Sequence, residues 1–588
     1  MSTIHSNVSF NLDGVNNFTI GGDVYSWDNA WLGYVDVWSG DTGSTYTATV
    51  NLSGSWDMST IRFNGQANIK VIITDTATPA ADRHIELLVA NGNTGGSKIT
   101  LNQTSVDFIQ GGQGIDTITV GSGSFTTIDG RDGNDVIKTG GGFVNSVLGG
   151  NGNDTLTTGA GNISLIGMGD GDDKVTLGAG NVEAIAMSGG NDTVIGGTGW
   201  VGVVDTNAGD DTVNVGNGNM ELIRVSDGNN TVTVGNGTVN AIVAFDGDDT
   251  VSITGTGFVG SIALGTGNHV VKTGAGYVDS VVTREGIDTV DIGAGGAGSV
   301  NLGSGKNTVT SVGWVDAIFG YSSTDIVTVG VDGAGSVNVG HGNNIVTTGA
   351  GWVGSIVGYN GIDKVNLGKG GTGSISVYGG DDTVVLSMLD VVDDKVLMNG
   401  GSGFDSVSFA AFTPGLVISL ASSAEVNTGK GIFILTGFEN LTGGGGDDTL
   451  TGNSVANIID GGKGNDIVRG YAGNDTLTGW AGVDNFVFNT ALNATTNVDT
   501  ITDFNAAADA IQIDNAIFAA LTVTGTLSAA AFKDLDAGAI DASDRIIYKT
   551  STGNLYYDAD GSGSAFAAVK FAVLANHAAL TAADFVVV

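Results

Sequence analysis

The chain has 588 residues, of which 100 are glycine, 2 are proline and none is cysteine, which argues against a mainly helical fold, a collagen-like fold and any disulfide or thiolate metal site. The 61 acidic residues exceed the 21 basic residues by 40, so no nucleic-acid partner is expected, because phosphate binding requires a basic surface. No apolar run reaches the length of a transmembrane segment.

The first 104 residues do not follow the repeat that dominates the rest of the chain. Residues Tyr46–Leu52 and Ile69–Thr74 have the alternating, β-branched character of strands. We therefore predict that residues 1–104 form a small N-terminal β domain or a cap on the repeats. The segment Met1–Gly14 has neither a basic region nor an apolar core, so it does not resemble a conventional signal peptide.

A repeat of 19 residues fills residues 105–390. Its marker is Gly-x-Asp followed by Thr or Val, and the aspartate position recurs in steps of 19, apart from one step of 20 and one of 18. Each period has room for two glycine turns and two short strands. The pattern therefore predicts an all-β chain folded as a parallel β-roll or β-solenoid of about fifteen coils, each burying its apolar face against its neighbours.

The two turns of each period differ in chemistry. The first turn ends in a carboxylate, whereas the second carries an apolar residue, as at Val144, Ile163, Val182, Val201, Met220, Val239, Val278 and Val353. We interpret the first edge as built to hold cations and the second as built to pack. Short carboxylates suit hard, oxygen-seeking cations, so Ca²⁺ is the expected ligand. The candidate metal ligands in this array are Asp116, Asp135, Asp154, Asp173, Asp192, Asp211, Asp249, Asp288, Asp363 and Asp382.

An alternative is that each aspartate merely caps its own turn. Against this, asparagine would cap equally well, yet the first six positions are all aspartate. Stacked carboxylates about 5 Å apart would also repel one another without counter-ions. Asn230, His269, Asn307 and Asn344 later interrupt the column, and Asp325 follows a turn without glycine, so we expect fuller calcium occupancy toward the N-terminal half.

Aromatic residues precede the apolar position of the second turn in six coils. They are Phe143, Trp200, Phe258, Tyr277, Trp314 and Trp352, and asparagine or glycine takes this place in most other coils. An exposed row would suit stacking on sugar rings or contact with another protein. The alternative is that the rings fold back and cover the edge of the solenoid.

A tighter repeat follows the non-repetitive segment 391–442, which we interpret as a connector. Residues 443–488 carry the nonapeptide Gly-Gly-x-Gly-x-Asp-x-U-x, where U is apolar, complete at Gly443–Leu450. Its aspartate position steps by nine, with a degenerate unit at Asn457. The candidate metal ligands of this second array are Asp448, Asp466, Asp475 and Asp484.

These nonapeptides resemble those of the RTX family of secreted bacterial proteins. Residues from about 400 to 588 resemble the C-terminal domain of serralysin-like RTX proteins, through the segments 437–442, 486–488, 501–504 and 582–588. The resemblance implies calcium held between coils by aspartate carboxylates and backbone carbonyls. It also implies export by a type I secretion machinery that recognises an uncleaved C-terminal signal, which Asp584–Val588 would fit, and hence an extracellular location.

The last segment, residues 489–588, is expected to form a mixed α/β end domain that carries the secretion signal. Within it, Asp558–Gly563 resembles the start of a calcium loop but lacks the full twelve-residue pattern, so a plain turn is the preferred interpretation.

No enzyme is expected from this sequence. The five histidines are never spaced as in H-E-x-x-H, no G-x-S-x-G elbow occurs, and the basic residues of the long array do not cluster. We therefore expect a calcium-dependent structural protein of the bacterial surface or extracellular matrix, such as a surface-layer, fibril or biofilm component, that self-assembles. The alternative is a secreted carbohydrate-binding adhesin that uses the N-terminal domain or the aromatic row to bind a polysaccharide.

Overall fold

The computed structural model describes residues 96–103, 105–389 and 395–588 in full, and only the backbone of the strands between residues 8 and 89. The chain divides into two compact units, residues 1–303 and 304–588, which are described separately. The parts of the predicted N-terminal domain that lie between these strands, and residues 390–394 at the start of the predicted connector, fall outside the described residues.

The first unit begins with strands that join two parallel sheets. Strand β7 pairs in parallel with β9, and β8 pairs in parallel with β10. A short antiparallel ribbon of β1, β2 and β3 precedes them. The bounds are β1 (Val8–Asp13), β2 (Asn17–Ile20), β3 (Asp23–Ser26), β4 (Tyr34–Ser39), β5 (Thr45–Ser53), β6 (Thr60–Gly65), β7 (Asn68–Asp75) and β8 (Glu86–Val89). The two runs predicted as strands lie within β5 and β7.

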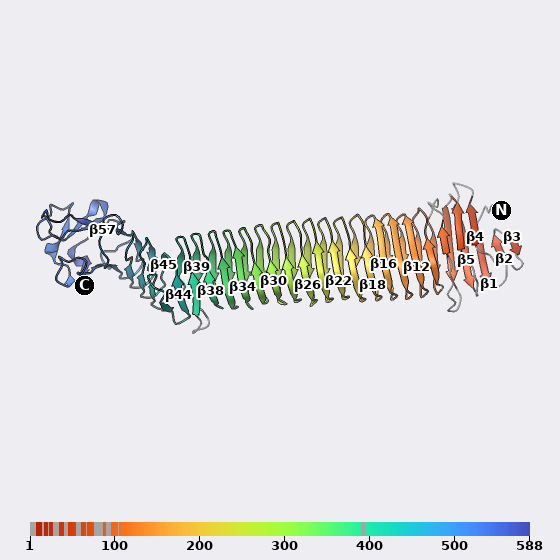
Figure 1. Ribbon diagram of the computed structural model, residues 1–588, viewed down its shortest axis with the longest axis horizontal. Helices are drawn as coiled ribbons and strands as arrows, with labels where there is room; N and C mark the ends of the chain where they lie inside the picture. The colour runs from red at the N-terminus through yellow and green to blue at the C-terminus, as the bar shows by residue number, and fades with distance from the viewer. Residues whose placement is uncertain are drawn as a thin grey trace. The chain divides into compact units, whose positions relative to one another are not determined.

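Successive coils then add one strand to each sheet, and these strands lie side by side in Figure 1. The first sheet contains β9 (Lys98–Leu101), β11 (Thr117–Val120), β13 (Val136–Lys138), β15 (Thr155–Thr157), β17 (Lys174–Thr176), β19 (Thr193–Ile195), β21 (Thr212–Gly216), β23 (Thr231–Val234), β25 (Thr250–Ile253), β27 (Val270–Thr273) and β29 (Thr289–Ile292). The second contains β10 (Val106–Gln110), β12 (Phe125–Asp132), β14 (Val144–Asn151), β16 (Ile163–Asp170), β18 (Val182–Ala186), β20 (Val201–Asp205), β22 (Met220–Val225), β24 (Val239–Ala244), β26 (Val259–Ala263), β28 (Val278–Val282) and β30 (Ala297–Asn301).

In these sheets, neighbouring strands are aligned so that each residue pairs with the residue one sequence period away. Ile137 of β13 pairs with Leu156 of β15, which pairs with Val175 of β17, so equivalent residues 19 apart stand beside one another. These inward side chains are fully buried, and their neighbours along each strand face outward, as a one-sided strand requires. The predicted parallel β-solenoid with 19-residue coils is therefore confirmed.

The second unit contains the same kind of coil. One sheet holds β31 (Thr308–Ser311), β33 (Ile326–Val329), β35 (Ile345–Thr348), β37 (Lys364–Leu367), β39 (Thr383–Leu386) and β41 (Ser406–Ser408). The other holds β32 (Val315–Phe319), β34 (Ala334–Gly340), β36 (Val353–Gly358), β38 (Thr372–Ser376), β40 (Lys395–Asn399) and β44 (Ile432–Thr436), with β43 (Glu425–Asn427) antiparallel at its end.

The coils shorten to 18 residues in the nonapeptide region, because each coil is two nonapeptides. Strand β46 (Thr449–Thr451) pairs with β48 (Ile467–Arg469), and β47 (Ile458–Asp460) pairs with β49 (Thr476–Thr478), all in parallel. The adjoining strands are β42 (Val417–Ser419), β45 (Asn440–Thr442), β50 (Asn485–Phe488), β51 (Asp499–Ile501) and β52 (Ala510–Ile513).

The last hundred residues end the two sheets with mixed pairing. The elements are β53 (Gly525–Thr526), η1 (Ala529–Ala531), β54 (Phe532–Asp534), β55 (Ile546–Lys549), η2 (Thr550–Thr552), β56 (Asn554–Tyr557), β57 (Val569–Leu574), η3 (Ala582–Asp584) and β58 (Phe585–Val587). No α-helix lies in residues 489–588, so the expectation of a mixed α/β end is wrong. The run Ala529–Ala531 makes only a single 3-10 turn, which is too short to nucleate an α-helix.

Candidate metal centre

The predicted aspartates of the first unit form one buried column along the edge where the first turns lie. Each side chain from Asp116 to Asp288 at an aspartate position is at most 2% exposed. From Asp116 to Asp192 the backbone N–H of each donates to Oδ1 of the aspartate one coil later, for example Asp116 to Asp135 at 2.7 Å and Asp173 to Asp192 at 2.9 Å. The column is thus a ladder of hydrogen bonds that ties each turn to the next.

The second unit contains the same ladder and a second one on the opposite edge. In the 19-residue coils, the N–H of Asp363 donates to Oδ1 of Asp382 at 2.7 Å. In the nonapeptide coils one ladder joins Asp448, Asp466 and Asp484, each bond being 2.8 Å long. Because every nine residues bring a new turn, the other edge carries its own ladder, in which Asn457 donates to Asp475.

The second carboxylate oxygen has no donor in many of these coils. Oδ2 is buried without a hydrogen-bond partner in Asp135, Asp154, Asp173, Asp192, Asp363, Asp382, Asp405 and Asp466. A buried acceptor without a donor is costly, and more so if it carries charge. The buried, unpaired Oδ2 therefore destabilises the folded turn unless a proton or a cation binds to it.

The pKa values of the column aspartates are raised because their carboxylates are buried in this way. Burial, with smaller contributions from neighbouring carboxylates, raises the pKa of Asp135 to about 8 and that of Asp173 and Asp192 to about 7. Burial likewise raises the pKa of Asp382 and Asp466 to about 7, against an ordinary value of 3.8. Without a counter-ion, the column resists carrying its negative charge near neutral pH.

A glycine five residues before the aspartate leaves room beside the carboxylate in some coils. A Cβ at Gly130 would collide with Oδ2 of Asp135 and approach the carbonyl oxygen of Gly149 in the next coil. Gly149 and Gly461 stand in the same relation to Asp154 and Asp466. The space therefore lies between a carboxylate oxygen and a backbone carbonyl, which are hard oxygen donors of the kind that calcium prefers.

These residues fit calcium in donor chemistry. In the described residues no three His, Cys, Asp or Glu side chains gather at one point, so each gap between coils offers few carboxylates and must draw on backbone carbonyls. This matches the mixed carboxylate and carbonyl coordination that the RTX resemblance implies. A bound calcium ion would supply positive charge to the orphaned oxygens and relieve the repulsion along the column.

The interrupting residues keep their places in the ladder. Asn230 and Asn344 accept from the preceding aspartate N–H at 3.0 and 2.9 Å, and Asp325 accepts from Asn307. The His269 ring is buried and its Nδ1 accepts from the N–H of Asp249 at 3.3 Å. Loss of the turn glycines before Asp325 therefore does not remove it from the column.

Four carboxylates extend the ladders beyond the sequence prediction. Asp405 accepts from Asp382, and Glu439 in turn accepts from Asp405. Asp499 accepts from Asp475, and Asp509 accepts from Asp484. They were missed because their spacing is 23 to 34 residues. The pattern of an acidic residue, any residue and an apolar residue, at or just before the start of a short strand, is the signal that could have found them, as in Asp499-Thr500-Ile501.

The aromatic row lies on the other edge and stays partly open to solvent. The six side chains are between 36% and 47% exposed, and the apolar residues that follow them are buried. The rings also lean over glycines, since a Cβ at Gly202 would lie 3.0 Å from Trp200 and one at Gly373 would lie 3.6 Å from Trp352. Both alternatives thus hold in part, because the rings fold over the strands and still present an apolar surface.

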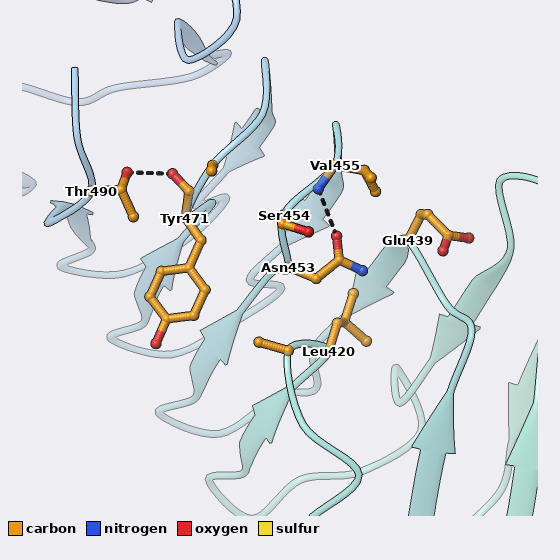
Figure 2. Close-up of a pocket in the computed structure, with 9 residues that line it drawn as sticks. Leu420, Glu439, Asn453, Ser454, Val455, Tyr471 and Thr490 are labelled. Carbon is orange, nitrogen blue, oxygen red and sulfur yellow. Dashed lines mark hydrogen bonds between the residues drawn. The ribbon is translucent and has the colours of Figure 1, made fainter. Parts of the chain in front are cut away.

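A shallow groove of about 470 Å³ lies beside the degenerate nonapeptide of the second unit, as Figure 2 shows. Leu420, Asn453, Val455 and Tyr471 are among its lining residues. Its one ionisable acid is Glu439, whose carboxylate already accepts from a ladder N–H. Asn453 is equally engaged, since its Oδ1 accepts from the N–H of Val455.

The calcium-binding character of the repeats is supported by comparison with known families. The family model described as RTX calcium-binding nonapeptide repeat (4 copies) matches residues 104–124, 127–143, 139–162, 435–454 and 451–486. These are stretches that retain the glycine five residues before the aspartate position, as at Gly111, Gly130, Gly149, Gly443, Gly452, Gly461, Gly470 and Gly479. No curated protein matches the chain.

The residues matched by the family model stop at 486, so the serralysin-like nature of the C-terminal end stays a prediction. Helices that could cross a membrane are absent from the residues the structure describes.

Proposed function

Since the chain carries RTX calcium-binding repeats on a parallel β-solenoid, we propose that it is a secreted structural protein of the bacterial surface or extracellular matrix, which folds and assembles on meeting extracellular calcium. Its role would be architectural rather than catalytic. Type I secretion would deliver it, and surface-layer, fibril or biofilm material is the expected product.

The observation that supports this proposal most directly is the buried carboxylate column. Oδ2 atoms of successive coils, such as Asp154 and Asp173, are buried without donors, so the folded state has positions that only a proton or a cation satisfies. A ligand that binds the folded state alone stabilises it by mass action. Many such positions in one stack would make the response to calcium steep.

The calcium dependence would also suit export. At low intracellular calcium, the net charge of −40 would favour an expanded chain through self-repulsion. Extracellular calcium modules bind with dissociation constants of about 10⁻⁴ to 10⁻³ M, so folding would begin outside the cell.

Two measurements test the proposal. Far-UV circular dichroism of the full chain, depleted of calcium and then titrated to millimolar calcium, should show a cooperative gain of β structure. A chain that is fully folded without calcium would overturn the folding switch. Electron microscopy with and without calcium should show sheets or filaments only with calcium, and monodisperse particles in both conditions would exclude the assembly role.

A second candidate function is binding of a cell-surface or matrix polysaccharide, which the exposed aromatic row favours. Trp200 in the first unit and Trp314 and Trp352 in the second are each about 40% exposed. Such rings can stack on sugar faces. Trp200→Ala and Trp352→Ala should weaken retention on polysaccharide beads without altering the calcium response. Undiminished retention would exclude the row as the site.

A further inference from the structure

Three of the 19-residue coils carry asparagine at the aspartate position. They are centred on Asn230 in the first unit and on Asn307 and Asn344 in the second. In Asn230 and Asn344 the side-chain Oδ1 accepts the ladder bond from the preceding aspartate, as Oδ1 of an aspartate does elsewhere. The amide nitrogen must therefore stand where an aspartate has its second carboxylate oxygen.

That amide nitrogen is fully used. In each of the three coils Nδ2 donates to the carbonyl oxygen two residues earlier, namely Gly228 at 3.0 Å, Gly305 at 3.0 Å and Gly342 at 3.1 Å. It also lies within hydrogen-bond distance of Oδ1 of the next carboxylate in the column, which is Asp249, Asp325 or Asp363, at 3.0 to 3.1 Å. The asparagine NH₂ group thus bridges a carbonyl oxygen of its own turn and a carboxylate of the following coil.

The aspartate coils have the same loop but lack this donor. Their Oδ2 atoms, as in Asp154, Asp173 and Asp192, occupy the equivalent position and are buried without a partner. An acceptor therefore stands where the asparagine coils place an N–H, next to the same kind of loop carbonyl. Two acceptors facing one another need a cation or a proton between them.

His269 shows a related solution in the coil after Asp249. Its Nε2 lies 3.2 Å from the carbonyl oxygen of Gly265, four residues earlier, and Asn230 reaches the corresponding carbonyl of Ser226 at 3.2 Å. The side chains that interrupt the aspartate column therefore share a nitrogen directed at the carbonyls of their own turn.

We infer that Asn230, Asn307 and Asn344 replace a bound calcium ion with an amide, and so act as calcium-independent clasps that divide the aspartate column of each unit into separately calcium-dependent runs. The inference rests on the proposed calcium function but makes a distinct claim, which concerns individual coils. A clasp closes its turn with hydrogen bonds internal to the chain, whereas an aspartate turn whose Oδ2 has no donor, such as that of Asp154 or Asp173, closes only with a cation or a proton. Calcium removal should therefore loosen the column unevenly.

Hydrogen exchange with mass spectrometry on the full wild-type chain tests this without any substitution. After calcium depletion near pH 7.5, amides around Asn230 and Asn344 should stay at least tenfold more protected than those around Asp154 and Asp173. Equal protection of both kinds of coil in the depleted protein, combined with normal calcium binding, would overturn the inference while leaving the proposed function intact. A wild-type chain that binds no calcium would instead overturn the proposed function.

A reciprocal pair of variants provides the second measurement. Asn230→Asp should gain one bound calcium ion by native mass spectrometry and lose the protection of its own coil on calcium depletion. The matched control Asp192→Asn, two coils earlier in the same column, should lose one calcium ion and gain protection in the depleted state. An unchanged calcium count in both variants would refute the substitution of amide for calcium.

Discussion

The calcium-free protein should become more ordered as the pH falls, which is the reverse of ordinary acid denaturation. Burial raises the pKa of Asp173, Asp192, Asp382 and Asp466 from 3.8 to about 7 in the folded chain. The folded state therefore binds these protons more tightly than the unfolded state. The resulting stabilisation is fully present below about pH 4, declines as the pH rises and is lost above about pH 7.

The stabilisation gained by protonating these carboxyls is large compared with the stability of a typical domain. Raising one carboxyl pKa from 3.8 to about 7 corresponds to about 4 kcal/mol of stability between the two pH limits. A whole domain is typically stable by about 5–15 kcal/mol, so a few such carboxyls decide whether the calcium-free chain folds. Calcium replaces the protons at neutral pH, and its apparent affinity should fall as the pH drops toward 5 because the two compete for the same oxygens.

The assay is far-UV circular dichroism of protein depleted of calcium on a chelating resin, measured from about pH 8 down to about pH 5. The β signal should appear on acidification without calcium, and at pH 8 only when calcium is added. The variant Asp173→Asn, which cannot titrate at that position, should show a smaller pH dependence. A depleted chain that is equally ordered at both pH values, or more ordered at pH 8, would refute the reasoning.

Three further outcomes are expected. Gly130→Ala places a Cβ against Oδ2 of Asp135, so the variant should bind one calcium ion fewer and have a lower Tm in the presence of calcium. The control Gly141→Ala, whose new Cβ has no atom within 4 Å, should change neither quantity. Equal effects of the two variants would exclude the space beside Asp135 as a calcium position. Ile166→Ala truncates a fully buried side chain and should lower the free energy of unfolding, measured in urea with calcium, by about 2–5 kcal/mol. Leu165 is 40% exposed, so Leu165→Ala should lower it by less than about 1 kcal/mol. Similar losses in the two variants would contradict the assignment of Ile166 to the inside of the coil and Leu165 to the outside. Glu425→Gln removes the exposed ion pair with Lys395 and should change stability by less than about 1 kcal/mol, so a larger loss would show that this pair is shielded from solvent.

The sequence predicted the coil because its determinants are local. Glycine turns, short alternating strands and one polar turn in each period lie within 19 residues, and the parallel register of Leu156 against Val175 follows from repetition alone. The burial of Val144, Val182 and Val201 followed from the same argument.

What the sequence did not reveal depends on contacts between segments of unequal length. Asp499 and Asp509 complete ladders after spacings of 24 and 25 residues, which no periodic pattern detects. The parallel stack of Tyr359 on Tyr378, with ring centres 5.6 Å apart, likewise arises only once the coils are aligned in space. The expectation of helices in residues 489–588 is wrong because helix propensity is a weak prior that sheet pairing overrides.

The aspartate ladder has a direction, and a second ladder in the same turns runs against it. Within each unit the backbone N–H of a column aspartate donates to the side chain of the turn that follows it in the chain, as in the bond from Asp135 to Asp154. The residue just before the aspartate does the reverse, since the N–H of Asp172 donates to Oδ1 of Asn153 in the preceding turn, and Oδ1 of Asp172 accepts from Asn191 in the following one. A cut on either side of such a coil would therefore leave one N–H and one side-chain oxygen without their partners. Truncation from the amino-terminal side and truncation from the carboxyl-terminal side should thus expose the same kinds of group.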